Sequence, residues 1–129
     1  MDRLAIFDLD GTLVDSRADI ARAANHARAA LGLAPHALDT VVAFVGDGAA
    51  RLIERMTPEA DAAGRARALA AFEEFYGAHC CVDTVVYPGI VALLAALQAA
   101  GWTLAVATNK PDAMTRTMLA GLGLARWFA

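Results

Sequence analysis

Two short apolar runs, each followed directly by polar residues, place the strongest constraint on the fold of this chain. The first run, at residues 3–8 (RLAIFD), is broken by Asp-x-Asp-Gly, and the second, at residues 102–107 (WTLAVA), is followed by Thr108 and Asn109. Both runs are too short for a helix, so each predicts a buried strand that ends in a turn. Helical patterns separate the two runs, and this strand–helix–strand order predicts a parallel α/β layer.

The residues between the two predicted strands form mainly helical patterns. Four of these follow one another, over residues 16–31, 39–44, 49–56 and 57–76. Ser16 and Asp39 are the predicted caps of the first two helices. The sequence Thr57-Pro58-Glu59 predicts the start of the fourth, because it combines a capping hydroxyl, a proline at the first helical position and an acid near the positive end of the helix dipole. Two further helices are predicted at residues 88–100 and 111–121.

Charge and composition exclude several classes of protein. The chain has 129 residues and a net charge of −3, which argues against binding to nucleic acid or to an anionic membrane surface. No run approaches the ~18 apolar residues of a membrane span, and the run before Asp8 is too short for a signal peptide. Cys80 and Cys81 are adjacent and poorly placed to bridge, which predicts reduced thiols in a cytoplasmic protein.

The residues that follow the first predicted strand point to chemistry. Because side chains alternate along a strand, we expect Asp8 and Asp10 on the same side, beyond the strand's carboxyl end, where parallel sheets bind ligands. Two neighbouring carboxylates repel each other unless a cation lies between them or one is protonated, and oxygen ligands of this kind suit Mg²⁺. Gly11 permits a turn that a Cβ would hinder, and Thr12 supplies the hydroxyl predicted to orient Asp10.

Residues 8–16 (DLDGTLVDS) resemble the first motif of the haloacid dehalogenase (HAD) superfamily of phosphohydrolases. Residues 108–111 (TNKP) resemble its second motif, and the helical stretch between them resembles a cap inserted directly after the first motif. Within that frame, residues 44–49 (FVGDGA) and 87–89 (YPG) are similar to bacterial phosphoglycolate phosphatases. The resemblance covers essentially the whole chain.

The resemblance implies an α/β fold with a HAD-like (Rossmannoid) parallel-sheet core and an inserted all-helical cap. Residues 1–14 and 87–129 then belong to the core, and residues 15–86 form the cap. The family also has a third-motif lysine, for which Lys110 is the sole lysine available, and a fourth-motif acid pair, for which the sequence has no candidate. We therefore expect an incomplete core that is truncated at its C-terminus, with a sheet edge open to pairing.

The mechanism that the resemblance implies is hydrolysis of a phosphomonoester through an aspartyl-phosphate. Asp8 would attack phosphorus, and Asp10 would protonate the leaving oxygen and then deprotonate the attacking water. Mg²⁺ would be held by the Asp8 carboxylate and the Asp10 backbone carbonyl, and would offset phosphate charge. The implied substrate-binding residues are Gly11, Thr12, Thr108, Asn109 and Lys110.

Several functions remain open at this point. A small phosphorylated metabolite, first of all 2-phosphoglycolate, is the expected substrate; a sugar phosphate, or a mutase reaction of the β-phosphoglucomutase kind, is the alternative. Residues 15–86 contain no lysine, which excludes the Schiff-base chemistry of the phosphonatase branch. A third possibility is a non-catalytic domain that self-associates through the open sheet edge.

Arg51 and Arg55 lie one helical turn apart in the predicted helix. Two interpretations of this pair are open: the arginines lie on a solvated helix face, or one of them binds a carboxylate of the substrate.

Overall fold

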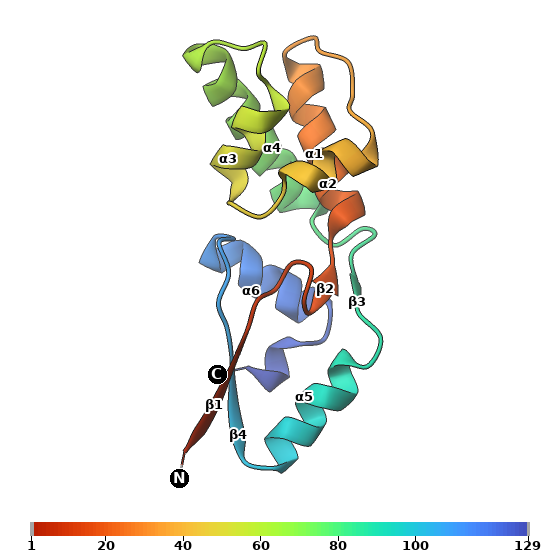
Figure 1. The fold of residues 1–129 in the computed structure, drawn as a ribbon, viewed down its shortest axis with the longest axis vertical. Coiled ribbons are helices and arrows are strands. Elements are labelled where there is room, and N and C mark those ends of the chain that lie inside the picture. The colour runs from red at the N-terminus through yellow and green to blue at the C-terminus, as the bar shows by residue number, and fades with distance from the viewer. Residues whose placement is uncertain (1, 129) are drawn as a thin grey trace. The chain divides into compact units, whose positions relative to one another are not determined.

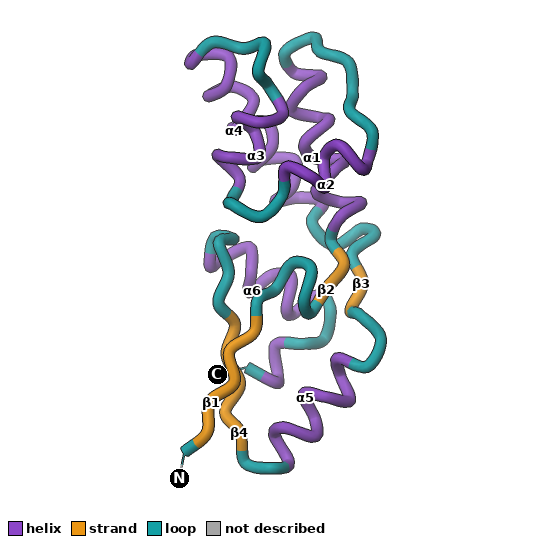
Figure 2. The backbone as a smooth tube through the Cα atoms, in the orientation of Figure 1, coloured by secondary structure: helices purple, strands orange, loops and turns teal. Residues whose placement is uncertain are grey.

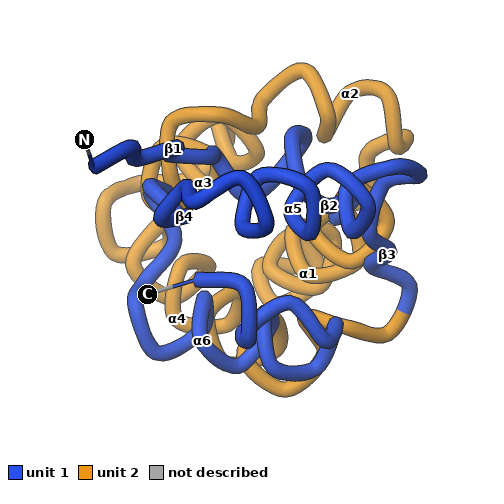
Figure 3. The backbone as a smooth tube through the Cα atoms, turned by 90° about the horizontal axis from the view of Figure 1, so that it is seen from below, with its two compact units in different colours: residues 1–16, 83–129 blue, residues 17–82 orange. Residues whose placement is uncertain are grey.

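The chain divides into two units that are described separately below. The computed structural model describes residues 2–128. Residues 2–16 and 83–128 form the sheet unit, and residues 17–82 form the helical unit (Figure 3). The chain thus leaves the sheet unit after Ser16 and returns to it at Asp83, inside the limits of 15 and 86 expected for the cap.

A parallel pair of strands forms the centre of the sheet unit. Strand β1 (Arg3–Phe7) pairs with β4 (Trp102–Val106), with Arg3 opposite Trp102 and Phe7 opposite Val106 (Figure 1). One residue further on, the Ala107 N–H donates to the Phe7 carbonyl at 2.8 Å. This pairing confirms the predicted parallel α/β layer. Because parallel strands share a carboxyl edge, the residues that follow β1 and β4 emerge at the same edge of the sheet.

The predicted burial of both strands is wrong for one face of β1. Leu4 is 55% exposed and Ile6 is 62% exposed, whereas Leu104 on β4 is 2% exposed. Alternation places Leu4 and Ile6 on one face, and Phe7 on the other face meets Phe128 edge to face, with 6.4 Å between ring centroids. The physical reason is that the described sheet has two strands, so apolar side chains suited to a sheet interior have no described layer above them.

Helices complete the sheet unit close to their predicted bounds. Helix α5 spans Ile90–Ala99, α6 spans Asp112–Gly121, and the short 3-10 helix η1 spans Ala125–Trp127. Gly89 precedes α5 at a φ of +85°, a left-handed conformation that glycine adopts without steric cost. Large side chains from each part of the unit are fully or almost fully buried: Leu9, Leu13, Leu94, Leu104, Met118 and Leu124.

A second, very short ladder was not foreseen from the sequence. Strand β2 (Val14–Asp15) pairs antiparallel with β3 (Val85–Val86), and the Tyr87 N–H extends the ladder by donating to the Leu13 carbonyl at 3.1 Å. A pair of two-residue strands has no periodicity to detect, because alternation needs at least four residues. The ladder holds together the two points at which the chain leaves and re-enters the sheet unit.

Four helices make up the helical unit, and it contains no described strand (Figure 2). They are α1 (Arg17–Ala30), α2 (Leu38–Phe44), α3 (Ala49–Met56) and α4 (Ala62–His79). Helix α1 packs against α4, and its alanines at positions 23, 24 and 27 are fully buried, so that the two backbones approach closely. No helix in the described chain is long and apolar enough to cross a membrane.

Two predicted helix starts are wrong. Helix α4 begins at Ala62 rather than near Thr57, and its cap is Asp61, whose carboxylate accepts a hydrogen bond from the Gly64 N–H at 2.8 Å. The Thr57 hydroxyl instead donates to the Ile53 carbonyl at 2.6 Å and so closes the end of α3. Ala37, not Asp39, is the residue that precedes α2. Thr57 therefore bonds within α3 instead of capping α4, and α2 begins without a side-chain cap.

A buried arginine holds the chain around Glu59 in place. Arg28, which is 5% exposed, donates to the backbone carbonyls of Ala34 and Met56 at 2.5 Å each. Its guanidinium also makes a bidentate contact with Glu59, at 3.2 and 3.0 Å. One side chain thus joins the end of α1, the loop after it, the end of α3 and the turn before α4.

Candidate active site

The first motif begins where β1 ends. Asp8 is exposed, Leu9 is fully buried and Asp10 is partly exposed, so the two acids alternate around an anchoring apolar side chain. One oxygen of Asp8, Oδ1, accepts a hydrogen bond from the Leu9 N–H at 2.8 Å. The carboxylate of Asp8 is therefore oriented by the backbone and open to solvent, an arrangement suited to a nucleophile.

A tight loop brings the chain back immediately after Asp10. Gly11 has a φ of +80°, and its N–H donates to the Val14 carbonyl at 2.9 Å. The N–H groups of Leu13 and Val14 both donate to the Leu9 carbonyl, at 3.0 and 3.2 Å. The loop thus requires the left-handed conformation that a Cβ would disfavour, which is the role predicted for Gly11.

Asp10 is held by two side chains on opposite oxygens. The Ser16 hydroxyl donates to Oδ1 at 2.6 Å, and the Lys110 ammonium lies 3.4 Å from Oδ2. The prediction that Thr12 orients Asp10 is therefore corrected: Thr12 is exposed, and Ser16 supplies the hydroxyl. The sequence predicts Ser16 as a helix cap, and its place at the end of the DLDGTLVDS segment is the signal for this second role.

The second motif forms a turn between β4 and α6. The Lys110 N–H donates to the Thr108 hydroxyl oxygen at 3.2 Å, so that the hydroxyl hydrogen of Thr108 is left to donate elsewhere. Asn109 is exposed, whereas the side chain of Lys110 is only 6% exposed and points to Asp10. The two motifs, about a hundred residues apart in sequence, are thereby joined by an ion pair.

The oxygen donors of the first motif are the predicted metal ligands. The described residues contain no group of three or more His, Cys, Asp or Glu side chains that could hold a metal ion. Mg²⁺ does not need such a group, because it keeps several waters and binds through one or two carboxylates plus substrate phosphate. The exposed Asp8 carboxylate and the backbone carbonyl of Asp10 fit part of such a coordination shell.

Residues of the helical unit that the sequence singled out are engaged within that unit. Arg55 contacts the Asp47 carboxylate at 2.7 Å and the Phe44 carbonyl at 3.0 Å, and Arg51 lies 3.3 Å from Glu54. These contacts favour the solvated-face interpretation of the two arginines over binding of a substrate carboxylate. Cys80 and Cys81 form no disulfide in the described chain, and their sulfur atoms are 3.6 Å apart.

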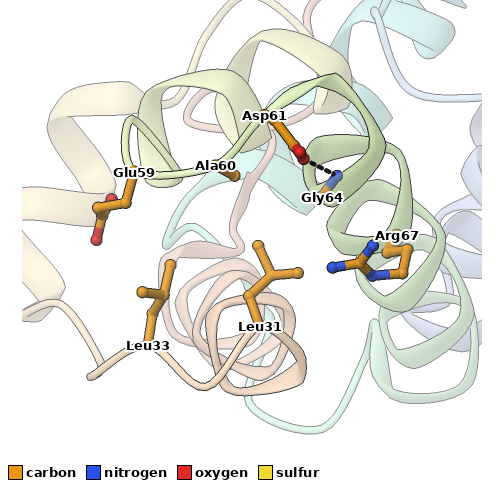
Figure 4. Close-up of a pocket in the computed structure, with 7 residues that line it drawn as sticks. All are labelled: Leu31, Leu33, Glu59, Ala60, Asp61, Gly64 and Arg67. Carbon is orange, nitrogen blue, oxygen red and sulfur yellow. Dashed lines mark hydrogen bonds between the residues drawn. The ribbon is translucent and has the colours of Figure 1, made fainter.

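The helical unit also has a pocket of about 350 Å³ that contains none of the predicted site residues (Figure 4). Its walls combine two leucines with charged groups, and the lining residues are Leu31, Leu33, Glu59, Ala60, Asp61, Gly64 and Arg67. Both carboxylates have structural partners, since Glu59 binds Arg28 and Asp61 caps α4. The pocket is therefore accounted for by the packing around these two contacts.

The fold and the two motifs define the class of protein. This chain belongs to the haloacid dehalogenase-like hydrolase family, whose model matches residues 5–129. Its α/β fold, with a partial parallel sheet, is the HAD-like fold. A solved structure described as a predicted phosphoglycolate phosphatase from Haemophilus somnus superimposes with a TM-score of 0.92 at 30% identity, covering 100% of this chain and 60% of that one.

Two curated relatives share a substantial part of their sequence with this chain. A phosphoglycolate phosphatase from Agrobacterium fabrum is 44% identical over 136 residues, which cover 98% of this chain and 56% of the relative. One from Thiobacillus denitrificans is 35% identical over 131 residues, covering 98% of this chain and 58% of the relative. The chain thus spans somewhat more than half the length of the curated proteins that it resembles.

Proposed function

We propose that this chain carries the nucleophile and the acid–base residue of a Mg²⁺-dependent phosphatase in the cytoplasm, and that its first substrate is 2-phosphoglycolate. The observation that carries the proposal is the meeting of the two motifs at one sheet edge, where Lys110 lies 3.4 Å from Asp10 and Asp8 is open to solvent. The names of the relatives reported above support the choice of substrate.

The chemistry follows from the placement of the two acids. The Asp8 carboxylate attacks phosphorus, the bond from phosphorus to the leaving oxygen breaks, and Asp10 gives that oxygen its proton. Water then attacks the aspartyl-phosphate, Asp10 takes a proton from the water, and inorganic phosphate leaves with Asp8 restored. Ser16 holds Asp10 in place for both transfers through the 2.6 Å hydrogen bond.

Groups of both motifs bind the phosphate in this proposal. The Thr108 hydroxyl, whose oxygen is already occupied by the Lys110 N–H, donates its hydrogen to a phosphoryl oxygen. Asn109, Gly11 and Thr12 are exposed and complete the phosphate contacts in this proposal. Mg²⁺, held by Asp8 and the Asp10 carbonyl, supplies charge neutralisation when bound. Residues 15–86 act as the cap that selects the substrate.

Phosphate release from 2-phosphoglycolate, with and without Mg²⁺, tests the proposal. We expect Mg²⁺-dependent release that Asp8→Asn reduces at least about a thousandfold, since the substitution removes the nucleophile and keeps the shape of the side chain. Asp112→Asn is the matched control, because Asp112 is an exposed acid of the same unit that contacts Arg116. Hexose phosphates assayed in parallel test the sugar-phosphate alternative. Equal phosphate release by the wild type and Asp8→Asn, or no release by the wild type, contradicts the proposal for this chain.

One observation favours a second function, self-association through the sheet. Leu4 and Ile6 are 55% and 62% exposed, and both strands of the described sheet have an unpaired edge. Such a surface invites pairing with another chain. Sedimentation at several protein concentrations tests it: association that Ile6→Ser abolishes, together with no Asp8-dependent turnover, would favour a non-catalytic role.

A further inference from the structure

The two oxygens of Asp10 are held in different ways. The Ser16 contact, at 2.6 Å, lies within the roughly 2.5–2.7 Å of a charge-assisted hydroxyl–carboxylate hydrogen bond, and Ser16 is 2% exposed. The Lys110 contact, at 3.4 Å, is longer than the roughly 2.7–2.9 Å of a charge-assisted hydrogen bond. Asp10 is therefore fixed on the Ser16 side, and its attraction to Lys110 is that of a nearby charge.

The side chain of Lys110 is long enough for its ammonium to contact either Asp10 or a nearby anion. Its backbone N–H is anchored on the Thr108 hydroxyl, while its ammonium lies at the end of a flexible four-carbon chain with three donors. Thr108 and Lys110 belong to the same turn, so an anion that accepts a hydrogen bond from Thr108 comes within reach of the Lys110 ammonium. Because the side chain of Lys110 is 6% exposed, its charge is only weakly screened by water.

We propose that the Lys110 ammonium neutralises Asp10 before substrate binds and passes to a phosphoryl oxygen when a phosphate dianion enters, while Ser16 keeps Asp10 in position. This inference rests on the proposed function and adds the exchange of Lys110 between two anions. The departure of Lys110 frees Oδ2 of Asp10 to take up a proton from solvent, which Asp10 then gives to the leaving oxygen and regains from the attacking water. Ser16 is a positioning residue in this scheme, since it acts through Asp10.

The sequence makes the exchange directly observable, because Lys110 is the sole lysine of the chain. Protein labelled with ¹³C,¹⁵N-lysine gives one set of lysine side-chain NMR signals. We expect these signals to shift when inorganic phosphate and Mg²⁺ are added to the wild-type chain. Line broadening of ³¹P in the same sample reports binding of phosphate independently.

Acylation of the amine tests the resting contact. An N-hydroxysuccinimide ester should modify Lys110 several-fold faster in Asp10→Asn than in the wild type, with the N-terminal amine as internal reference. Asp112→Asn removes a carboxylate two residues from Lys110 that contacts Arg116 instead, so it should leave the rate unchanged. Ser16→Ala should raise the rate by less than Asp10→Asn, and Ser16→Thr should restore it.

The outcomes separate this inference from the proposed function. Phosphate binding without any shift of the lysine signals overturns the exchange and leaves the proposed phosphatase site intact. Equal acylation of wild type and Asp10→Asn overturns the resting ion pair. A wild-type chain that binds no phosphate overturns the exchange and counts against the proposed function as well. The phosphate titration uses the unaltered chain, so its result does not depend on whether a variant folds.

Discussion

The two units of this chain contrast in where their exposed apolar side chains lie. In the helical unit, Ile53 is 1% exposed, Met56 0% and Tyr76 2%, and a buried arginine joins four backbone segments. The exposed large apolar side chains of the helical unit lie at helix ends or in loops: Leu38, Val45 and Val82. The sheet unit instead exposes such side chains within its strands and α5, to 42% or more: Leu4, Ile6, Val85, Val91 and Leu93. The predicted chemistry nevertheless lies in the sheet unit. Most of the apolar side chains that regular elements leave uncovered are thus found in the same unit as the candidate active site.

The largest expected effect sharpens this contrast by placing the same substitution in both units. Ile53→Ser should lower the free energy of unfolding of the helical unit by about 4 kcal/mol, because it removes a buried side chain and buries a hydroxyl. Ile6→Ser, at a position 62% exposed, should change stability by less than about 0.5 kcal/mol. Urea unfolding followed by circular dichroism measures both, and comparable losses would remove the contrast.

The second prediction compares two arginines of the helical unit. Arg28→Ala should cost about 3 kcal/mol, since it leaves the Ala34 and Met56 carbonyls without their donor and opens a space in the interior. Arg51→Ala removes an exposed pair with Glu54 and should cost no more than about 0.5 kcal/mol. The same urea titration distinguishes them. Similar costs for the two variants would mean that Arg28 does not join the segments as described.

Replacement by alanine should change stability in opposite directions at two glycines. Gly11→Ala should destabilise the first-motif loop by about 1 kcal/mol, because φ is +80° there although no atom lies within 4 Å of the added Cβ. Gly77→Ala, inside α4 with equally open surroundings, should stabilise by about 0.5 kcal/mol. Hydrogen exchange of the two segments measures the difference locally, and a shared sign would contradict the assigned conformations.

The smallest expected effect is the pH dependence of the helical unit. The hydrogen bonds from Arg28 hold the pKa of Glu59 below its ordinary value of 4.5. A lowered carboxyl pKa contributes stability that is complete above 4.5 and is lost as the pH falls through the lowered value. Urea midpoints between neutral and acidic pH should therefore fall more for the wild type than for Glu59→Gln. An identical fall in both would show that Glu59 does not contribute.

Much of the fold could be predicted from sequence because its signals are local. The apolar runs before Asp8 and Thr108, and the glycine and proline residues between helices, determine where strands and helices start and end. The start of α4 is harder to predict, because Thr57-Pro58-Glu59 and Asp61 both offer capping signals and the structure uses Asp61. The two-residue strands β2 and β3 were missed because only their pairing defines them.

The candidate site was predictable in its residues and only partly in its contacts. Asp8 and Asp10 follow from strand alternation and the motif, and Lys110 follows from the second motif. That Ser16 rather than Thr12 binds Asp10 depends on how the loop from Gly11 to Val14 folds back, which hydrogen bonds to the Leu9 carbonyl determine. Residue type alone does not distinguish two hydroxyls four positions apart.

The short ladder between β2 and β3 makes the helical unit a replaceable module. Val14 lies opposite Val86 and Asp15 opposite Val85, so the ends of the inserted segment are already side by side in the sheet unit. Lengthening a loop whose ends are held together costs little further entropy, about 0.6 kcal/mol for each doubling. Insertions of very different size, or a plain turn, are therefore compatible with the same sheet edge, and the inserted module can be exchanged without rebuilding the residues of the two motifs.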